Sequence, residues 1–307
     1  KIDVFERERF KDILVVFFLS CIVSYFICDY IWAPIRGILL GPLQDSFIYM
    51  LFGAGIPEEI IKIIPLLIIL KRTKFINEPI DYLIYASASA LGFAFLENID
   101  YIYIYRDDAP NIIAIRSLLP TFMHMACSSF FGFGIFFFME TKKIKYILIF
   151  FAIAASTHAL YNSGFNLSGL GFLFPMLLER TMFIIIILYY ARLIRSLINI
   201  SPFYNQEKTL RLKGGSRFLG LAVLAVHISN IIFIFYYAPL NNEIYMQRVW
   251  LVDFGYIILA FIIYKIIAHN LKTNKGEFKI LGKKRFKLFS EMQETIIKNY
   301  YAKIERH

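Results

Sequence analysis

Long apolar blocks, separated by short polar gaps, run along most of this chain. Eight of them approach or exceed the roughly 20 residues of helix that cross about 30 Å of hydrocarbon. They cover residues 12–33, 46–70, 80–105, 111–140, 145–165, 170–194, 217–239 and 248–269. Neither an internal repeat nor a linker rich in Pro, Gly or Ser divides them. The pattern therefore predicts an all-α polytopic membrane protein with about eight transmembrane helices in one domain.

The composition indicates the same class of protein. Apolar residues make up 58% and aromatic residues 18% of the 307 residues, and the mean hydropathy is +0.60, which exceeds what soluble domains carry. Cys21, Cys28 and Cys127 all fall inside apolar blocks. They form neither a disulfide framework nor a CxxC metal motif, so we interpret them as packing residues.

The positive charges give these helices an orientation. Most of the 33 lysines and arginines precede the first block, occupy every second gap or follow the last block, and the opposite side holds only Arg36, Arg106, Arg116 and Arg248, in gaps or near the starts of blocks. Cytoplasmic loops carry the Lys/Arg excess of membrane proteins, so we predict that both termini are cytoplasmic. A basic surface facing the lipid bilayer accounts for the net charge of +10, and no nucleic-acid partner is expected.

The polar segment after the last block is predicted to be a separate unit. We place the integral-membrane domain at residues 1–271 and a basic cytoplasmic tail at residues 272–307, where apolar residues alternate with lysines and arginines. Such a tail could lie against anionic headgroups or remain solvated.

Ionisable residues inside the apolar blocks carry most of the functional information, because a charge in hydrocarbon is costly and marks a functional site or a paired partner. The informative positions are Glu58, Glu59, Lys62, Glu97, Asn98, His124, Ser128, His158 and Asn162. At about 1.5 Å of helix rise per residue, Glu59, Glu97, His124 and His158 lie roughly 18 to 27 Å from the cytoplasmic side. Groups from four helices at a common depth are expected to meet in one site.

Spacing supports this convergence. The pairs His124 with Ser128 and His158 with Asn162 are each four residues apart, which puts both side chains on one face of a helix. Other intramembrane polar residues have plainer interpretations. Glu179 and Arg180 are expected to form an ion pair that braces helices and His227 to be structural, whereas the role of Asp253 stays open.

The block at residues 46–70 breaks the usual rules for helices. Gly53, Gly55 and Pro57 precede two glutamates, which predicts a helix interrupted near residues 53–56 that begins again at Pro57. Glu58 and Glu59 would then lie in a first turn, where the helix dipole favours negative charge. Lys62 can neutralise either one of them, and the other would be free to act as a base. The sequence leaves open which one is free.

Together these motifs resemble the PrsW family of intramembrane proteases, which is in turn similar to the CAAX prenyl protease and bacteriocin-processing group. The resemblance rests on GIPEEIIKIIPLL (55–67), FAFLEN (93–98), the His124 motif and HALYN (158–162). These motifs place the catalytic core at about residues 46–165. By the resemblance, the catalytic positions are Glu58, Glu59, Glu97, His124, His158 and Asn162.

The resemblance implies peptide hydrolysis within the bilayer. Glu58 or Glu59 would act as general base on a water, and Asn162 would donate a hydrogen bond to the developing oxyanion. His124, His158 and Glu97 would either hold a zinc ion or position the water without a metal. Because the wider group has a histidine where Glu97 stands, fewer imidazoles are available to a metal here. Supporting roles are expected for Lys62, Asn98 and Ser128.

The resemblance further implies a membrane-anchored protein substrate, such as an anti-sigma factor, that is cut toward the outer side of the membrane. Frequent Ile, Phe, Tyr and Lys indicate an AT-rich bacterial genome, so we expect a bacterial inner membrane. Two other functions would use the same polar cluster. One is an ion-coupled transporter or channel, which should show an internal repeat. The other is a non-catalytic membrane binding protein, whose function would tolerate Glu59→Gln.

Overall fold

The described part of the chain is helical. The computed structural model describes residues 5, 8–43, 46–72, 76–106, 116, 119–164, 173–206, 258, 261, 274–278, 294–295, 298 and 302. Within these residues there is no strand, and five helices are long and apolar enough to cross a membrane. The prediction of an all-α polytopic membrane protein is therefore confirmed. The predicted span 46–70 is helical but is not among these five. The predicted spans 217–239 and 248–269 lie outside the described residues, apart from Ile258 and Phe261, so the count of eight remains a prediction.

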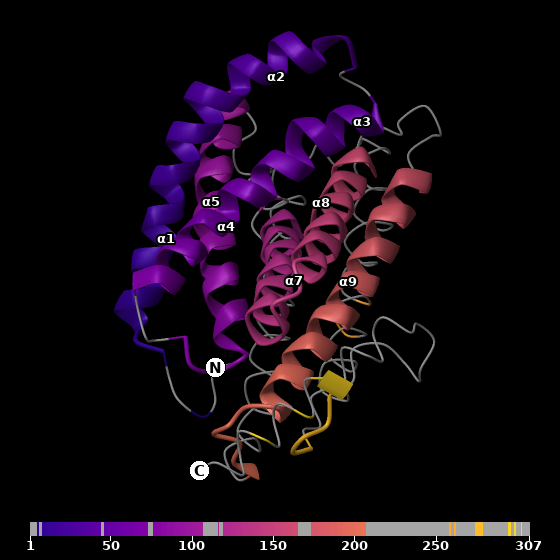
Figure 1. Ribbon diagram of the computed structural model, residues 1–307. Helices are drawn as coiled ribbons and strands as arrows, with labels where there is room; N and C mark the ends of the chain where they lie inside the picture. Colours follow the sequence, from indigo (N-terminus) through magenta and orange to yellow (C-terminus); the bar gives the residue numbers. More distant parts are fainter. Residues whose placement is uncertain are drawn as a thin grey trace, which may run out of the picture.

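The first helix is longer than the predicted 12–33. It consists of α1 (Phe10–Ser24), the π-helix η1 (Tyr25–Trp32), α2 (Ala33–Leu40) and the 3-10 turn η2 (Gly41–Leu43), and it runs along one side of the bundle (Figure 1). Most of its large apolar side chains are exposed, as expected for a helix facing lipid. On its inner side it packs against Gly92, where an added Cβ would lie 2.1 Å from the Phe17 carbonyl oxygen. Only glycine permits this close approach.

The second helix is continuous where the sequence predicts an interruption. It consists of α3 (Phe47–Met50), the π-helix η3 (Leu51–Gly55) and α4 (Ile56–Arg72). Pro57 has no N–H to donate to the Gly53 carbonyl, and the Trp32 indole Nε1 donates to that oxygen instead, at 2.8 Å. The helix therefore widens into a π-turn without breaking, because a side chain of the first helix satisfies the backbone group that the proline leaves unpaired.

The remaining helices complete the bundle around α7. They are α5 (Asp81–Ile104), α7 (Leu119–Thr141), α8 (Lys145–Gly164) and α9 (Leu173–Asn199). α7 contacts α4, α5, α8 and α9, and Figure 1 shows it in the interior, with α1 and α9 on opposite sides. The rings of Phe5, before α1, and Tyr204, after α9, lie 5.5 Å apart. The start of α1 and the end of α9 thus share one end of the bundle, as expected if both are cytoplasmic.

A short piece of the predicted tail docks at this same end. Phe278 is 3% exposed, and its ring centroid lies 6.3 Å from that of Phe133 and 6.1 Å from that of Phe137, both on α7. Arg195 of α9 pairs with Glu277 at 3.0 Å, and the Asn199 amide donates to the Glu277 carbonyl at 2.7 Å. Phe278 and Glu277 therefore pack against protein, whereas Asn274 and Lys275 are exposed, and the predicted tail at residues 272–307 stays a prediction.

The burial of Phe278 predicts that this side chain contributes to the free energy of unfolding. Phe278→Ala should lower the free energy of unfolding by about 3 kcal/mol, because truncation of a buried phenylalanine leaves a cavity in the aromatic cluster. Thermal unfolding of the purified protein in detergent measures the change. Lys275→Ala, at an exposed position of the same turn, is the control and should leave the midpoint unchanged. Equal midpoints for the two variants would contradict the docking.

Candidate active site

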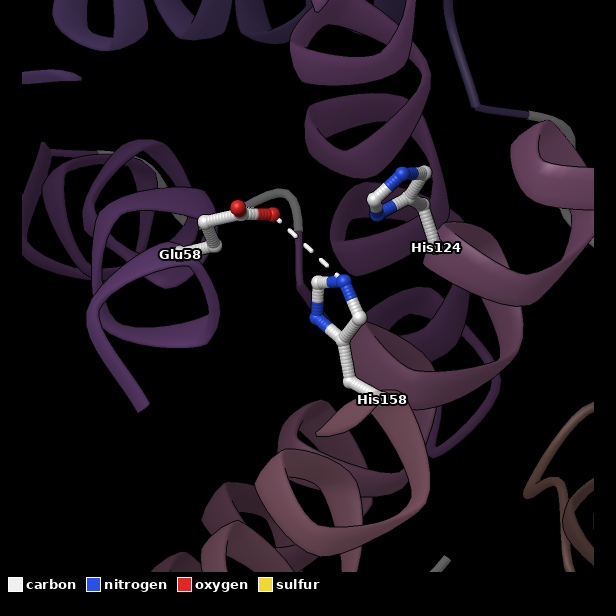
Figure 2. Close-up of side chains that lie close together, drawn as sticks. All are labelled: Glu58, His124 and His158. Carbon is white, nitrogen blue, oxygen red and sulfur yellow. Dashed lines mark ion pairs between the residues drawn. The ribbon is translucent and has the colours of Figure 1, made fainter. Parts of the chain in front are cut away.

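Polar side chains from four helices meet inside the bundle. They are Glu58, Glu59 and Lys62 on α4, Glu97 on α5, His124 and Ser128 on α7, and His158 on α8. Figure 2 shows Glu58, His124 and His158 pointing toward one another from their separate helices. The structure thus brings together the residues that the sequence places at a common depth.

The Lys62 ammonium group lies at the centre of this cluster and is fully buried. Its Nζ is 2.7 Å from Glu59 Oε1 and 2.8 Å from His124 Nδ1. It also lies 4.5 Å from the centroid of the Phe93 ring, on the π face that attracts cations. Because an ammonium group only donates hydrogen bonds, His124 Nδ1 is the acceptor.

Both oxygens of Glu59 are occupied. Oε1 receives the Lys62 ammonium and lies 3.0 Å from His158 Nδ1, and Oε2 accepts a hydrogen bond from the Ser128 hydroxyl at 2.8 Å. The side chain is fully buried. This carboxylate is therefore the paired member of the two adjacent glutamates and joins α4 to α7 and α8.

Glu58 is much less engaged than Glu59. Its Oε2 lies 3.7 Å from Lys62 Nζ and 3.5 Å from His158 Nε2, and this buried oxygen has no hydrogen-bond partner in the described part of the chain. The Glu58 side chain is 14% exposed, whereas that of Glu59 is completely covered. Of the two adjacent glutamates, Glu58 is therefore the less engaged carboxylate among the described residues, and which of them acts as the base stays a prediction.

Each imidazole is held on one side by a carboxylate. His124 Nδ1 accepts from Lys62, so its Nε2–H donates to Glu97 Oε2 at 2.9 Å. His158 donates from Nδ1 to Glu59 at 3.0 Å, which leaves a lone pair on Nε2 facing Glu58. The two rings are perpendicular, with centroids 4.9 Å apart. The carboxylates thereby fix which nitrogen of each ring faces the centre of the cluster.

The residues suited to a metal ion differ from the predicted set. Among the described residues, Glu58, His124 and His158 form a group whose ligand atoms all lie within 4.8 Å of one another. The predicted set contains Glu97 in place of Glu58, but Glu97 lies behind His124. A carboxylate that holds the outer nitrogen of a metal-binding histidine is a common arrangement. Two buried atoms of this group, Glu58 Oε2 and His158 Nε2, make no hydrogen bond to the described residues, so these two donors are open to a metal ion. His124 Nδ1 is hydrogen-bonded to Lys62 at 2.8 Å, and it becomes a third donor only when the ammonium group moves off it.

Two predicted site residues remain, Asn98 on α5 and Asn162 on α8. Asn98 accepts a hydrogen bond from Arg116 Nε at 2.9 Å. The Asn162 amide is half-buried and stands one turn after His158 on α8. Arg116 also pairs with Glu97 at 2.8 Å. Sequence reasoning did not assign this arginine to the site, and its only signal was its position near the start of the predicted span 111–140, on the side with few cations. The side chains of Glu179 and Arg180, like His227 and Asp253, lie outside the described residues.

Comparisons with known proteins agree on one family. Residues 10–191 match the family described as PrsW family intramembrane metalloprotease. Protease PrsW of Geobacillus kaustophilus (strain HTA426) is 28% identical to this chain over 164 residues, which is 52% of this chain and 69% of that protein. No solved structure matches this chain.

The different pairing of the two glutamates predicts different effects on stability. Glu59→Gln should lower the free energy of unfolding by about 3 kcal/mol, because it leaves the buried Lys62 ammonium without its nearest counter-charge. Glu58→Gln should cost less than about 1 kcal/mol, since its contact with Lys62 is long and its side chain is partly exposed. Thermal unfolding in detergent compares the two variants. A larger loss for Glu58→Gln would show that the pairing is reversed.

Proposed function

Since this chain belongs to the PrsW family of intramembrane metalloproteases and is a peptide hydrolase of the bacterial cell membrane, we propose that Glu58, His124 and His158 form its hydrolytic centre. Family membership gives the reaction class. The assignment of these three residues is a further step, and it rests on the side-chain geometry of the cluster.

One observation carries the assignment. Glu58 Oε2 and His158 Nε2 lie 3.5 Å apart, and both are buried without a hydrogen bond to the described residues. Buried polar atoms are normally satisfied, because an unmet hydrogen bond costs free energy in a medium of low dielectric constant. The surrounding polar groups satisfy one another. These two atoms are therefore the ones available to a ligand, a water or a substrate.

A divalent metal ion of the zinc type suits these donors. His158 and Glu58 would hold it through their open atoms, and His124 would join them once its Nδ1 exchanges the Lys62 ammonium for the ion. Two histidines and one carboxylate are a known ligand set of catalytic zinc sites. Such an ion, when bound, supplies a nucleophilic water at neutral pH and polarises the peptide carbonyl. Glu97 and Glu59 keep the two imidazoles in the tautomers that direct a lone pair toward the centre.

The chain's own residues then account for the proton transfers. A carboxylate has two oxygens, so Glu58 can hold a ligand with one oxygen and accept the proton of the attacking water with the other. As the water oxygen bonds to the carbonyl carbon, the Asn162 amide donates to the oxyanion that forms. Glu58 next passes its proton to the leaving amine as the peptide bond breaks. Lys62 stays paired with Glu59 and takes no part in the proton transfers.

The substrate class follows from where the centre lies. The site is enclosed by α4, α5, α7 and α8, and the last three of these are long and apolar enough to cross a membrane. A protein anchored in the same bilayer can present a peptide bond at this depth. We therefore propose a membrane-anchored protein as substrate, and an anti-sigma factor is the candidate that the family resemblance implies.

Cleavage assays test the roles of Glu58 and His158. In proteoliposomes that contain a single-span substrate, Glu58→Gln and His158→Ala should each lower the cleavage rate by at least about 10²-fold, the usual contribution of a positioned acid–base group. Glu140→Gln, at the cytoplasmic end of α7, is the control and should cleave at the wild-type rate. Cleavage by Glu58→Gln at that same rate would refute the assignment.

Metal analysis of purified protein tests the ligand set independently of activity. Wild-type protein should hold one zinc or another divalent ion per chain, and His124→Ala and His158→Ala should each lose it. Glu58→Gln should weaken metal binding, because an amide is a poorer ligand than a carboxylate. Glu97→Gln should retain the metal with lower affinity, since Glu97 acts through His124. Loss of metal in Glu97→Gln together with full retention in Glu58→Gln would instead favour the set predicted from the sequence.

A further inference from the structure

Three residues of α5 contact the side chain of Arg116. Its Nη2 lies 2.8 Å from Glu97 Oε2, its Nε donates to Asn98 Oδ1 at 2.9 Å, and its guanidinium carbon lies 3.6 Å from the centroid of the Tyr101 ring. Two nitrogens and one face of the guanidinium are thus engaged at once. Only arginine combines a rigid fork of donors with a planar face that stacks on an aromatic ring.

The backbone of Arg116 is fixed as well. The Thr121 hydroxyl, in the first turns of α7, donates to the Arg116 carbonyl at 3.0 Å, and the Asn98 amide lies 3.4 Å from the same hydroxyl. Asn98, Arg116 and Thr121 therefore close a ring of hydrogen bonds between α5 and the start of α7. This ring places Arg116 next to the hydrolytic centre, although the residue lies in the connection between two helices.

A single oxygen atom of Glu97 links Arg116 to His124 of the hydrolytic centre. Glu97 Oε2 accepts a hydrogen bond from His124 Nε2 at 2.9 Å, and the same oxygen forms the ion pair with Arg116 Nη2. The Glu97 side chain is 26% exposed, so without the guanidinium its carboxylate could turn toward the open side of the site. His124 would then lose the partner that holds its ring and its tautomer.

We propose that Arg116 is a positioning residue of the protease, which acts through Glu97 to hold His124 with Nδ1 directed toward the hydrolytic centre. This inference rests on the proposed role of His124. Arg116 itself neither transfers a proton nor contacts the reacting atoms. It fixes the carboxylate that fixes the imidazole, and it balances the charge of Glu97 in a poorly hydrated environment.

Three variants separate positioning from a merely structural role. Arg116→Gln should lower kcat about 10- to 100-fold with little change in KM, as expected for loss of a group that orients a catalytic histidine. Arg116→Lys should recover only a small part of that loss, because an ammonium group cannot span Glu97 and Asn98 together. Thr121→Val breaks the hydrogen-bond ring but keeps the ion pair, so it should stay within about threefold of wild-type kcat. Arg192→Gln is the control, since Arg192 also lies over a tyrosine but far along α9.

A double-mutant cycle shows whether Arg116 acts through Glu97. In a Glu97→Gln background, Arg116→Gln should cause almost no further loss of kcat or of metal affinity, measured by competition with a zinc chelator. An undiminished further loss, or a change confined to KM, would overturn the inference, as would an Arg116→Gln variant as active as wild type. Failure of the proposed centre looks different, because Glu58→Gln and His158→Ala would then remain active. If Glu97→Gln is too slow to assay, chelator competition alone completes the cycle.

Discussion

The buried ammonium group of Lys62 is the interaction on which the rest of the site depends. A lone charge at this depth would be prohibitively costly, so the helices that surround it must supply compensating groups. α4 supplies Glu59 and α7 supplies His124 as acceptors, and α8 supplies His158, which donates from Nδ1 to the same Glu59 oxygen that binds Lys62. Each of these contacts fixes one helix relative to the others. The polar cluster is thus part of what determines how the bundle packs, as well as the place where chemistry can occur.

This arrangement depends on a close approach of α4 and α8. An added Cβ at Gly55 would lie 2.5 Å from the Ala155 carbonyl oxygen, so the π-turn before α4 can touch α8 only because a glycine stands there. The contact lies three residues before Glu58 and three before His158, and it therefore helps to set the distance between these two groups. π-Turns are common near functional sites because they shift the facing of the residues that follow. Here the turn is held open by Trp32, from a different helix.

Much of this could be predicted from the sequence. The apolar blocks gave the helices, and the rare polar residues within them identified Glu58, Glu59, Glu97, His124 and His158, because charge is so costly in hydrocarbon that few such residues occur without a role. Spacing alone could not separate Glu58 from Glu59, since both lie within reach of Lys62 along the same helix. Ser128 and His158 decide between them, and they come from other helices. The role of Arg116 could not be predicted for a different reason, because a single cation between two helices of the bundle looks like an ordinary solvated residue.

The different environments of the glutamates follow from the number of hydrogen-bond donors that each one contacts. Lys62, Ser128 and His158 direct their hydrogens at Glu59, and Arg116 and His124 direct theirs at Glu97. Glu58 receives only long contacts. A site in which every polar atom were satisfied would be more stable and could bind nothing, because any ligand would have to displace a bond already made. The unpaired atoms of Glu58 and His158 cost stability, and the neighbouring ion pairs offset this cost by holding the same helices together. In the proposed centre, stability and reactivity would therefore fall to adjacent residues of one helix turn, which would account for two glutamates in succession in a membrane helix.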